Sequence, residues 1–140
     1  ALELKPDEPD LLAEMGEALM YAGRFDDAIR QINRAIQLKD GKPPYWYLWN
    51  RARVHYMSMK YQDALDTIAT IKDPPADVFL ITAASKARLG DIQGARDDMA
   101  IFTRSDPDWS VAKSAHYRYV NDSDRQHWLE GLRLAGLKEK

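Results

Sequence analysis

The feature that most constrains the fold of this chain is a short pattern that recurs about every 34 residues. A turn, an apolar residue and an Ala three positions later occur three times, and Ala28, Ala64 and Ala95 are 36 and 31 positions apart. Repeats of this length are typical of arrays of helical pairs, in which each unit packs only against its neighbours. The pattern therefore predicts an all-α array rather than a single closed core.

Within each unit the apolar residues have helical spacing. In the first unit Leu12, Met15, Gly16 and Leu19 recur at intervals of three and four, so they form one stripe that we expect to pack inward. Gly23 follows this stripe as a typical helix end. We expect helices at about 1–5, 9–22, 25–39, 44–58, 61–72, 76–89 and 92–104, and a terminal helical region at 108–135.

These residues resemble the tetratricopeptide repeat (TPR), which has small and bulky apolar residues at fixed positions of two helices. The three units fill that pattern with Leu12, Met15, Gly16, Leu19, Ala28, Ile32 and Ala35, with Leu48, Ala52, Tyr61, Ala64, Ile68 and Ile71, and with Phe79, Ala83, Ile92, Ala95, Met99, Phe102 and Pro107. The resemblance implies a right-handed α-α superhelix of three TPR helical hairpins with a C-terminal capping helix. The sequence departs from the pattern at Arg51, His55 and Lys86, where the repeat has apolar or aromatic residues.

The resemblance also divides the chain into three parts. Residues 1–6 are similar to the last turn of a preceding repeat, so we expect that a repeat has been cut away upstream. Residues 7–107 hold the three TPR-like repeats, and residues 108–140 form C-terminal capping helices and a tail. Because the last repeat of an array needs its exposed end covered, we expect the amphipathic terminal helix to cover it.

The C-terminal part has a resemblance of its own. The stretch 119–122 followed by 128–137 is similar to the ending of TPR regions in bacterial multidomain regulators. Many of those regulators are class III adenylate or guanylate cyclases, and some carry a winged-helix DNA-binding domain instead. The resemblance implies the regulatory or signalling part of a cytoplasmic bacterial protein. It transfers no catalytic residue, because nothing in the chain corresponds to a cyclase core.

Composition and motifs argue against chemistry within this chain. There is no Cys, and 20 basic residues against 22 acidic ones give a net charge of -2, so a basic field for nucleic acid is absent. The three His residues have no metal-binding spacing, and the sequence has neither a G-x-S-x-G elbow nor a Gly-rich phosphate loop. We therefore expect no catalytic residue, no metal and no cofactor here. A catalytic domain such as a nucleotide cyclase would lie elsewhere in the parent chain.

The candidate site is the concave surface of the array, which the first helix of each pair would line. Trp46 and Trp49 are three positions apart in an aromatic run at 44–50, and Trp, Tyr and Arg are the residues most enriched at binding hot spots. The alternative is that either indole simply packs against the neighbouring units or the terminal helix. The predicted partner-binding residues are Glu17, Tyr21, Trp46, Trp49, Asn50, Arg53, Tyr56, Leu80, Ala84 and Arg88.

The chemistry of this surface narrows the expected partner. TPR domains that bind chaperone carboxylates resemble one another in a basic-and-Asn clamp, and at its positions this chain has Ala13, Glu17, Asn50, Asp77 and Ile81. Only Asn50 agrees, so that function is disfavoured. The surface instead suits an apolar or amphipathic helix or an extended peptide, from another protein or another domain of the same chain, with an acidic group meeting Arg53 or Arg88.

Two other functions stay open at this stage. The array could act as a dimerisation scaffold, in a homo-oligomer without a free peptide ligand. Alternatively, Trp46, Trp49 and Tyr56 beside Arg53 could stack the bases of single-stranded nucleic acid, although the acidic balance makes this a minor alternative. No apolar run reaches the roughly 18–20 residues that a membrane span needs, so no membrane partner is expected.

Overall fold

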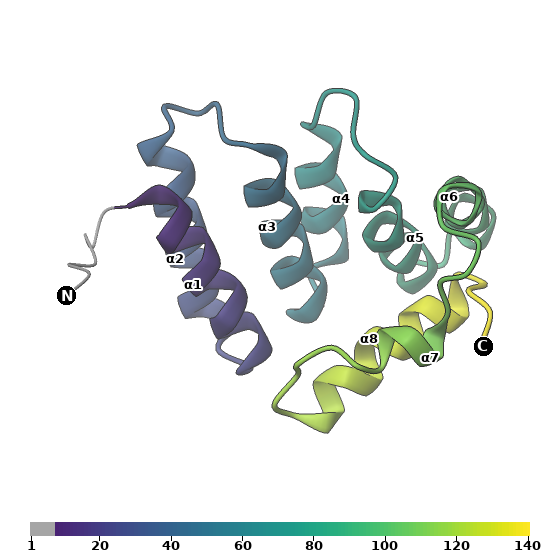
Figure 1. The fold of residues 1–140 in the computed structure, drawn as a ribbon. Coiled ribbons are helices and arrows are strands. Elements are labelled where there is room, and N and C mark those ends of the chain that lie inside the picture. Colours follow the sequence, from purple (N-terminus) through teal and green to yellow (C-terminus); the bar gives the residue numbers. More distant parts are fainter. Residues whose placement is uncertain (1–7) are drawn as a thin grey trace.

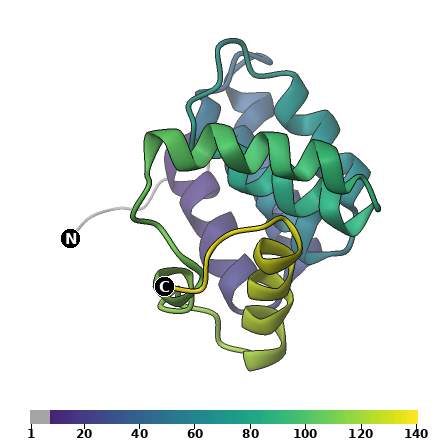
Figure 2. The same ribbon diagram turned by 90° about the vertical axis from the view of Figure 1, so that its right-hand side faces the viewer.

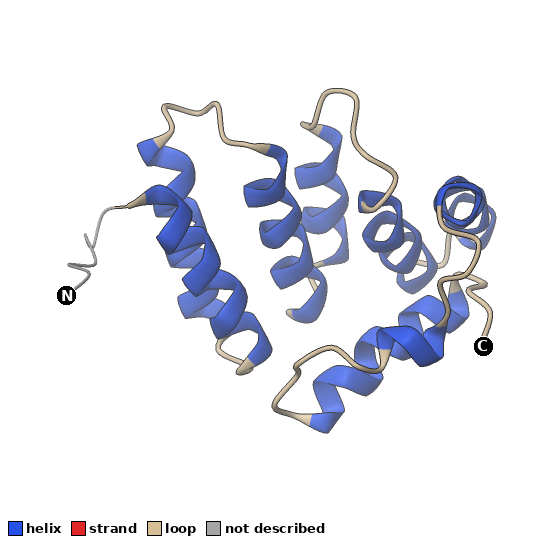
Figure 3. Cartoon of the chain, viewed as in Figure 1, coloured by secondary structure: helices blue, strands red, loops and turns tan. Residues whose placement is uncertain are grey.

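The computed structural model describes residues 8–140, and within them the chain is all-helical, with eight helices and no strand (Figures 1 and 3). The helices are α1 (Pro9–Tyr21), α2 (Phe25–Leu38), α3 (Tyr45–Met57), α4 (Tyr61–Ala69), α5 (Val78–Arg88), α6 (Ile92–Ser105), α7 (Val111–Ser114) and α8 (Asp122–Leu134). The all-α prediction is confirmed. The expected helix at 1–5 and the remnant of a preceding repeat lie outside the described residues.

Consecutive helices pack in pairs, α1 on α2, α3 on α4 and α5 on α6. A tight turn joins the helices of each pair, and each turn contains one residue with positive φ: Gly23 (82°), Met59 (63°) and Gly90 (90°). Gly adopts this conformation freely, whereas the Cβ of Met59 makes it unfavourable. The first helices of the pairs, α1, α3 and α5, also contact one another in succession (Figure 1). We call the surface that they share the inner face.

Small residues allow the helices of each pair to approach closely. Ala28, Ala64 and Ala95, the three Ala residues of the recurring pattern, have no exposed surface. A Cβ built on Gly16 would lie 2.4 Å from Cγ1 of Ile32, so α1 and α2 meet at a point where no larger residue fits. The recurring small residues therefore lie at the helix contacts, which explains why the pattern spans both helices of a pair.

The expected inward stripe of α1 is wrong at one position. Met15 is 43% exposed and belongs to neither buried cluster, whereas Ala13 and Met20 are fully buried. The reason is that α1 contacts α3 as well as α2, so that the buried side of α1 includes Ala13 and Met20. Ala13 and Met20 are thus part of the core.

The loops around the Pro pair at 74–75 are longer than expected. Helix α4 ends at Ala69 instead of near 72, and α5 begins at Val78 instead of near 76. Asp73 adopts a positive φ of 50° in this loop, and Pro74 and Pro75 lack the N–H groups that a continuing helix would use. The terminal region contains two helices, since α7 stops at Ser114 and α8 starts at Asp122.

The C-terminal residues 109–139, which we call the strap, cross the inner face (Figures 1 and 2). Helix α8 contacts α5 and α3, and the loop before it reaches α1, where the N–H of Val120 donates to the carbonyl of Tyr21 at 2.9 Å. The expectation that the terminal helix covers the end of the array is therefore corrected. Trp128, Leu129 and Leu132 are buried, so the apolar stripe of α8 packs on the inner face instead.

Candidate functional site

One half of the inner face is covered by the strap. Tyr56 is fully buried beneath α8, its ring stacks on His127 with 4.8 Å between centroids, and a Cβ on Gly131 would overlap its hydroxyl. Arg88 donates from Nη2 to the carbonyl of His127 at 2.8 Å and from Nε to the hydroxyl of Tyr56 at 3.2 Å. The Cβ of Ala84 would lie 3.4 Å from the same added methyl carbon. We call Tyr56, Ala84 and Arg88 the covered half, because the chain itself occupies this part of the predicted site.

Burial also sets the titration of the covered half. It raises the pKa of Tyr56 to about 12, although the neighbouring Arg88 opposes the shift. The pKa of His127 is lowered, first by burial and then by the positive charge of Arg88, while Asp124 acts in the opposite direction. The strap therefore packs against this surface with a neutral imidazole, whose Nε2 lies 2.8 Å from the hydroxyl of Tyr61.

In the other half of the inner face, the side chain of Arg53 contacts residues of α1 and α3. Its Nη1 donates to Glu17 at 2.7 Å and to the side-chain oxygen of Asn50 at 3.2 Å, and its Nη2 donates to the hydroxyl of Tyr21. Its Cζ lies 5.3 Å from the ring centroid of Tyr21 and 5.0 Å from that of Trp49, within cation–π range.

Arg53 is only 9% exposed. Burial alone would lower its pKa, but the surrounding tyrosines and Glu17 outweigh this effect and raise it. Because Arg53 already has a carboxylate partner inside the protein, it is not displayed for an acidic group of a ligand. The expectation that a partner's acidic group meets Arg53 is corrected on this ground.

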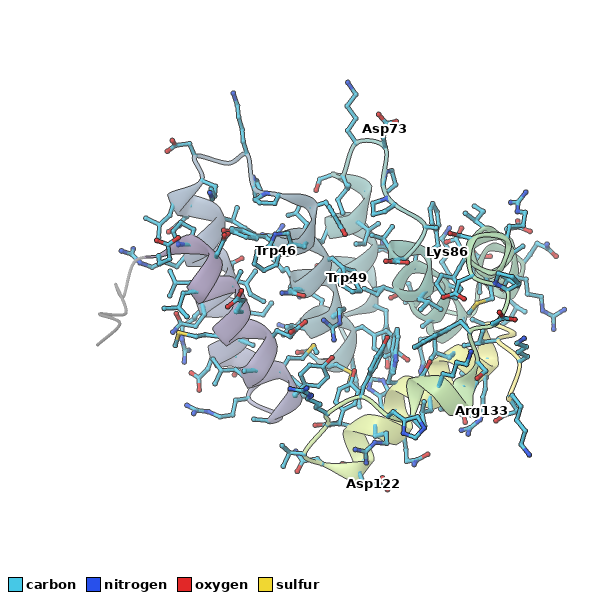
Figure 4. The ribbon with its side chains drawn as sticks, in the orientation of Figure 1. Trp46, Trp49, Asp73, Lys86, Asp122 and Arg133 are labelled. Atoms are coloured by element: carbon cyan, nitrogen blue, oxygen red, sulfur yellow. The ribbon has the colours of Figure 1, made fainter. Side chains whose placement is uncertain are left out.

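The two indoles of α3 have different surroundings (Figure 4). Trp46 packs edge-on against Tyr47, with 4.6 Å between ring centroids, and joins the small cluster around Leu12, Ala13 and Ala35. Tyr47 in turn donates to Asp10, and Asn50 approaches the carbonyl of Ala13 at 3.5 Å. Trp46 thus packs against the neighbouring helical pair, as the alternative interpretation of the sequence allowed. Trp49, by contrast, lines two cavities of the inner face.

Two adjoining cavities beside Trp49 form what we call the aromatic groove. The smaller cavity, of about 110 Å³, lies among Tyr21, Trp49, Arg53, Ile81, Tyr117 and Trp128. The larger, of about 210 Å³, lies among Trp49, Leu80, Phe102, Trp109, Tyr117 and the acidic pair Asp77 and Asp106. Trp49, Leu80, Asp77 and Tyr117 line both. A third cavity, of about 500 Å³, continues from Glu17 and Tyr21 toward His116 and Arg118.

The aromatic groove has negative charge at its rim. Glu17 is paired with Arg53, but the exposed carboxylates of Asp77 and Asp106 have no ion-pair partner within residues 8–140. Burial raises the pKa of the Tyr117 phenol, and the charges of Asp77 and Glu17 add to that effect while Arg53 opposes it. The groove is therefore an aromatic surface with two uncompensated carboxylates.

Sequence reasoning missed the strap residues of the groove. Trp109 and Tyr117 have no place in the repeat pattern, and their ring centroids lie 6.1 Å apart across the groove wall. The available signal was the density of large aromatics at 109–119, a segment with too few helical positions to bury them all locally. Asp77 was expected on the concave surface of the third pair, at a position where it disagrees with the carboxylate clamp.

The described residues contain no cluster of three or more His, Cys, Asp or Glu side chains that could hold a metal ion. His127 contacts Tyr56 and Tyr61, while the His55 ring, whose pKa burial lowers, has a buried Nδ1 without a hydrogen-bond partner among residues 8–140. In the same part of the chain no helix has the length and apolar character of a membrane span. No family model, curated protein or solved structure matches the chain.

Proposed function

We propose that the chain is a non-catalytic protein–protein or intramolecular interaction module of the TPR type, whose aromatic groove binds a peptide segment of a partner. The paired packing of the helices, the succession of α1, α3 and α5 and the buried Ala residues of the recurring pattern support a TPR superhelix of three hairpins. The same proposal includes what the C-terminal resemblance implies, namely that the chain is a regulatory or scaffold segment of a cytoplasmic bacterial signalling protein.

One observation carries this proposal, namely that Trp49, Trp109 and Tyr117 keep part of their surface exposed around a hollow of the inner face. Large aromatics in a concave, partly desolvated surface are typical of the few residues that dominate protein interfaces. The inner face also accommodates a helical segment of the chain itself, because α8 occupies the covered half. A partner segment would extend along the part that the strap leaves open.

The nucleic-acid alternative loses support from the same geometry. Trp46 packs against the neighbouring pair, Tyr56 is buried beneath the strap, and Arg53 is engaged with Glu17. These side chains therefore do not present a shared surface on which bases could stack. The scaffold alternative makes a different prediction, a stable dimer of the chain in solution, which light scattering would detect.

The proposal is tested by selecting peptides from a random display library against the 140-residue chain and measuring each selected peptide by calorimetry. We expect Trp49→Ala to weaken binding at least fivefold, or about 1 kcal/mol, because this indole lines both cavities of the groove. Trp46→Ala is the matched control on the same helix and is expected to leave the affinity within twofold, with circular dichroism verifying that both variants are helical.

Two results would contradict the proposal. One is that the library yields no peptide that binds in solution while the chain is a stable dimer, which would favour the scaffold alternative. The other is that Trp46→Ala and Trp49→Ala weaken the selected peptides equally, which would place the binding surface outside the aromatic groove.

A further inference from the structure

The protein shows within itself how its inner face holds a cation. The guanidinium of Arg53 lies against the rings of Tyr21 and Trp49 and is neutralised by Glu17 at 2.7 Å. An aromatic wall and one carboxylate, together with the side-chain oxygens of Asn50 and Tyr21, thus hold an arginine at 9% exposure. Cation–π contacts of this kind gain strength when water is excluded.

The larger cavity of the groove, also lined by Trp49, has an aromatic wall and carboxylates of the same kind, but no cationic side chain of residues 8–140 lines it. Trp49, Trp109 and Tyr117 form its walls, Leu80 and Phe102 are its buried apolar residues, and the cavity of about 210 Å³ is well above the roughly 10–15 Å³ that one water needs.

The carboxylates of Asp77 and Asp106 at the rim are without an ion-pair partner among the described residues. Lys138, which approaches this end of the strap, donates instead to the backbone carbonyl of Pro107 at 2.7 Å. The protein therefore supplies the aromatic walls and the acidic rim of a cation site but not the cation.

We propose that this cavity, lined by Trp49, Trp109 and Tyr117 with Asp77 and Asp106 at its rim, binds a cationic side chain of the partner segment, with arginine preferred over lysine. The inference rests on the proposed function and specifies its chemistry. A planar guanidinium can stack on an aromatic face and donate to two carboxylates at once, which an ammonium group does less well.

Other occupants fit the cavity less well. An acidic side chain would meet two like charges at the rim, which disfavours it at close range. A purely apolar side chain would fill the walls but would remove water from Asp77 and Asp106 without giving them a partner, and uncompensated desolvation of a carboxylate is costly. A cation satisfies both the rings and the carboxylates.

The probe is N-acetyl-arginine amide, with N-acetyl-citrulline amide as its neutral control of nearly the same shape. The chain has four Trp residues, and each gives one indole N–H signal in a nitrogen–proton correlation spectrum. We expect the arginine probe to shift the signals of Trp49 and Trp109 in a saturable way and to leave that of Trp46 unchanged. The citrulline probe should bind at least tenfold more weakly.

A pair of variants tests the carboxylates. The double variant Asp77→Asn/Asp106→Asn removes two exposed charges, and because the side chain of Asp77 makes no capping hydrogen bond to α5, we expect the fold to be retained. It should weaken the arginine probe at least fivefold. The matched control Asp26→Asn/Asp40→Asn removes two charges at α2 and its following turn, and should change the affinity less than twofold.

Three outcomes would overturn the inference: equal binding of the citrulline probe, equal weakening by both double variants, or selected peptides that depend on Trp49 but are not enriched in arginine or lysine. The last outcome would contradict the cation site but not the proposed interaction module. Conversely, a library without binding peptides together with a saturable arginine response would keep the cation site and contradict the proposed function.

Discussion

Both halves of the inner face contain residues of α3 and α5, and they differ in what covers them. In the covered half the strap supplies the partners, because Arg88 donates to the carbonyl of His127 and Tyr56 stacks on its ring. In the open half Arg53 is satisfied within the array by Glu17 and Trp49. An aromatic inner face is therefore not a free surface by default. Only the half whose arginine is paired without the strap can receive a partner while the strap stays in place.

The sharpest test of this comparison is truncation of the central aromatic residue in each half. Tyr56→Ala should lower the free energy of unfolding by about 3–5 kcal/mol, since it empties a fully buried site between α3 and α8. Trp49→Ala should cost only about 1–2 kcal/mol, because part of that indole is already in contact with solvent. Urea denaturation followed by circular dichroism measures both. Equal losses of unfolding free energy would mean that the strap does not bury the covered half more deeply than the open half.

A smaller effect is expected from a single methyl group at the strap contact. Gly131→Ala places a Cβ on the hydroxyl of Tyr56, and such overpacking destabilises a protein by about 1–3 kcal/mol. The higher helix propensity of Ala offsets up to about 1 kcal/mol of this loss. We therefore expect a net loss in urea denaturation. Tyr56→Phe removes the hydroxyl together with its hydrogen bonds to Arg88 and His127, so it is the reference: adding Gly131→Ala to it should cost clearly less than adding Gly131→Ala to the wild type. An equal loss in both backgrounds would place the overlap elsewhere.

Acid should weaken the covered half before the open half. The pKa of His127 is lower in the folded protein than its ordinary value near 6.5, so the unfolded chain binds more protons in the interval between the two values. The contribution of the neutral His127 ring to the free energy of unfolding is therefore fully present above a pH of about 6.5. It is lost as the pH falls toward and through the pKa of His127 in the folded protein.

The variant His127→Gln isolates this effect, since His55 titrates in both proteins. The difference in unfolding free energy between wild type and variant should shrink on acidification through this interval. A difference independent of pH would show that His127 does not titrate in the strap contact.

Much of the helical framework followed from local signals in the sequence. The starts of α2, α4 and α6 at Phe25, Tyr61 and Ile92 coincide with the predicted ones, because each follows a turn and precedes an Ala that must be small. The position of α8 did not follow. Its apolar stripe fits either the end of the array or the inner face, and the spacing of residues within a helix does not distinguish two apolar surfaces.

The candidate site could be predicted from the sequence only in part. Trp49, Tyr21 and Leu80 line the groove, and Glu17 and Arg53 were named beside them, but their pairing depends on how closely α1 approaches α3. Tyr56, Ala84 and Arg88 lie under a strap whose placement was not foreseen. Trp109 and Tyr117 were missed because residues outside a repeat carry no positional pattern.

The smallest expected effect concerns α3, which contributes residues to both halves. The turn after α3 places Met59 at φ 63°, where the first and third pairs have Gly, and Met59 is 68% exposed, so its side chain contributes little packing. A left-handed conformation costs a residue with a Cβ about 1–2 kcal/mol, while Gly costs about 0.5–1 kcal/mol of extra backbone entropy, so Met59→Gly should gain roughly 0.5 kcal/mol. Urea denaturation measures this gain, and Leu89→Gly, at an exposed position with φ -84° beside the third turn, should show none. Because the change relieves strain without touching either half, peptide affinity at the groove should stay the same; an altered affinity would mean that the position of α3 couples the two halves.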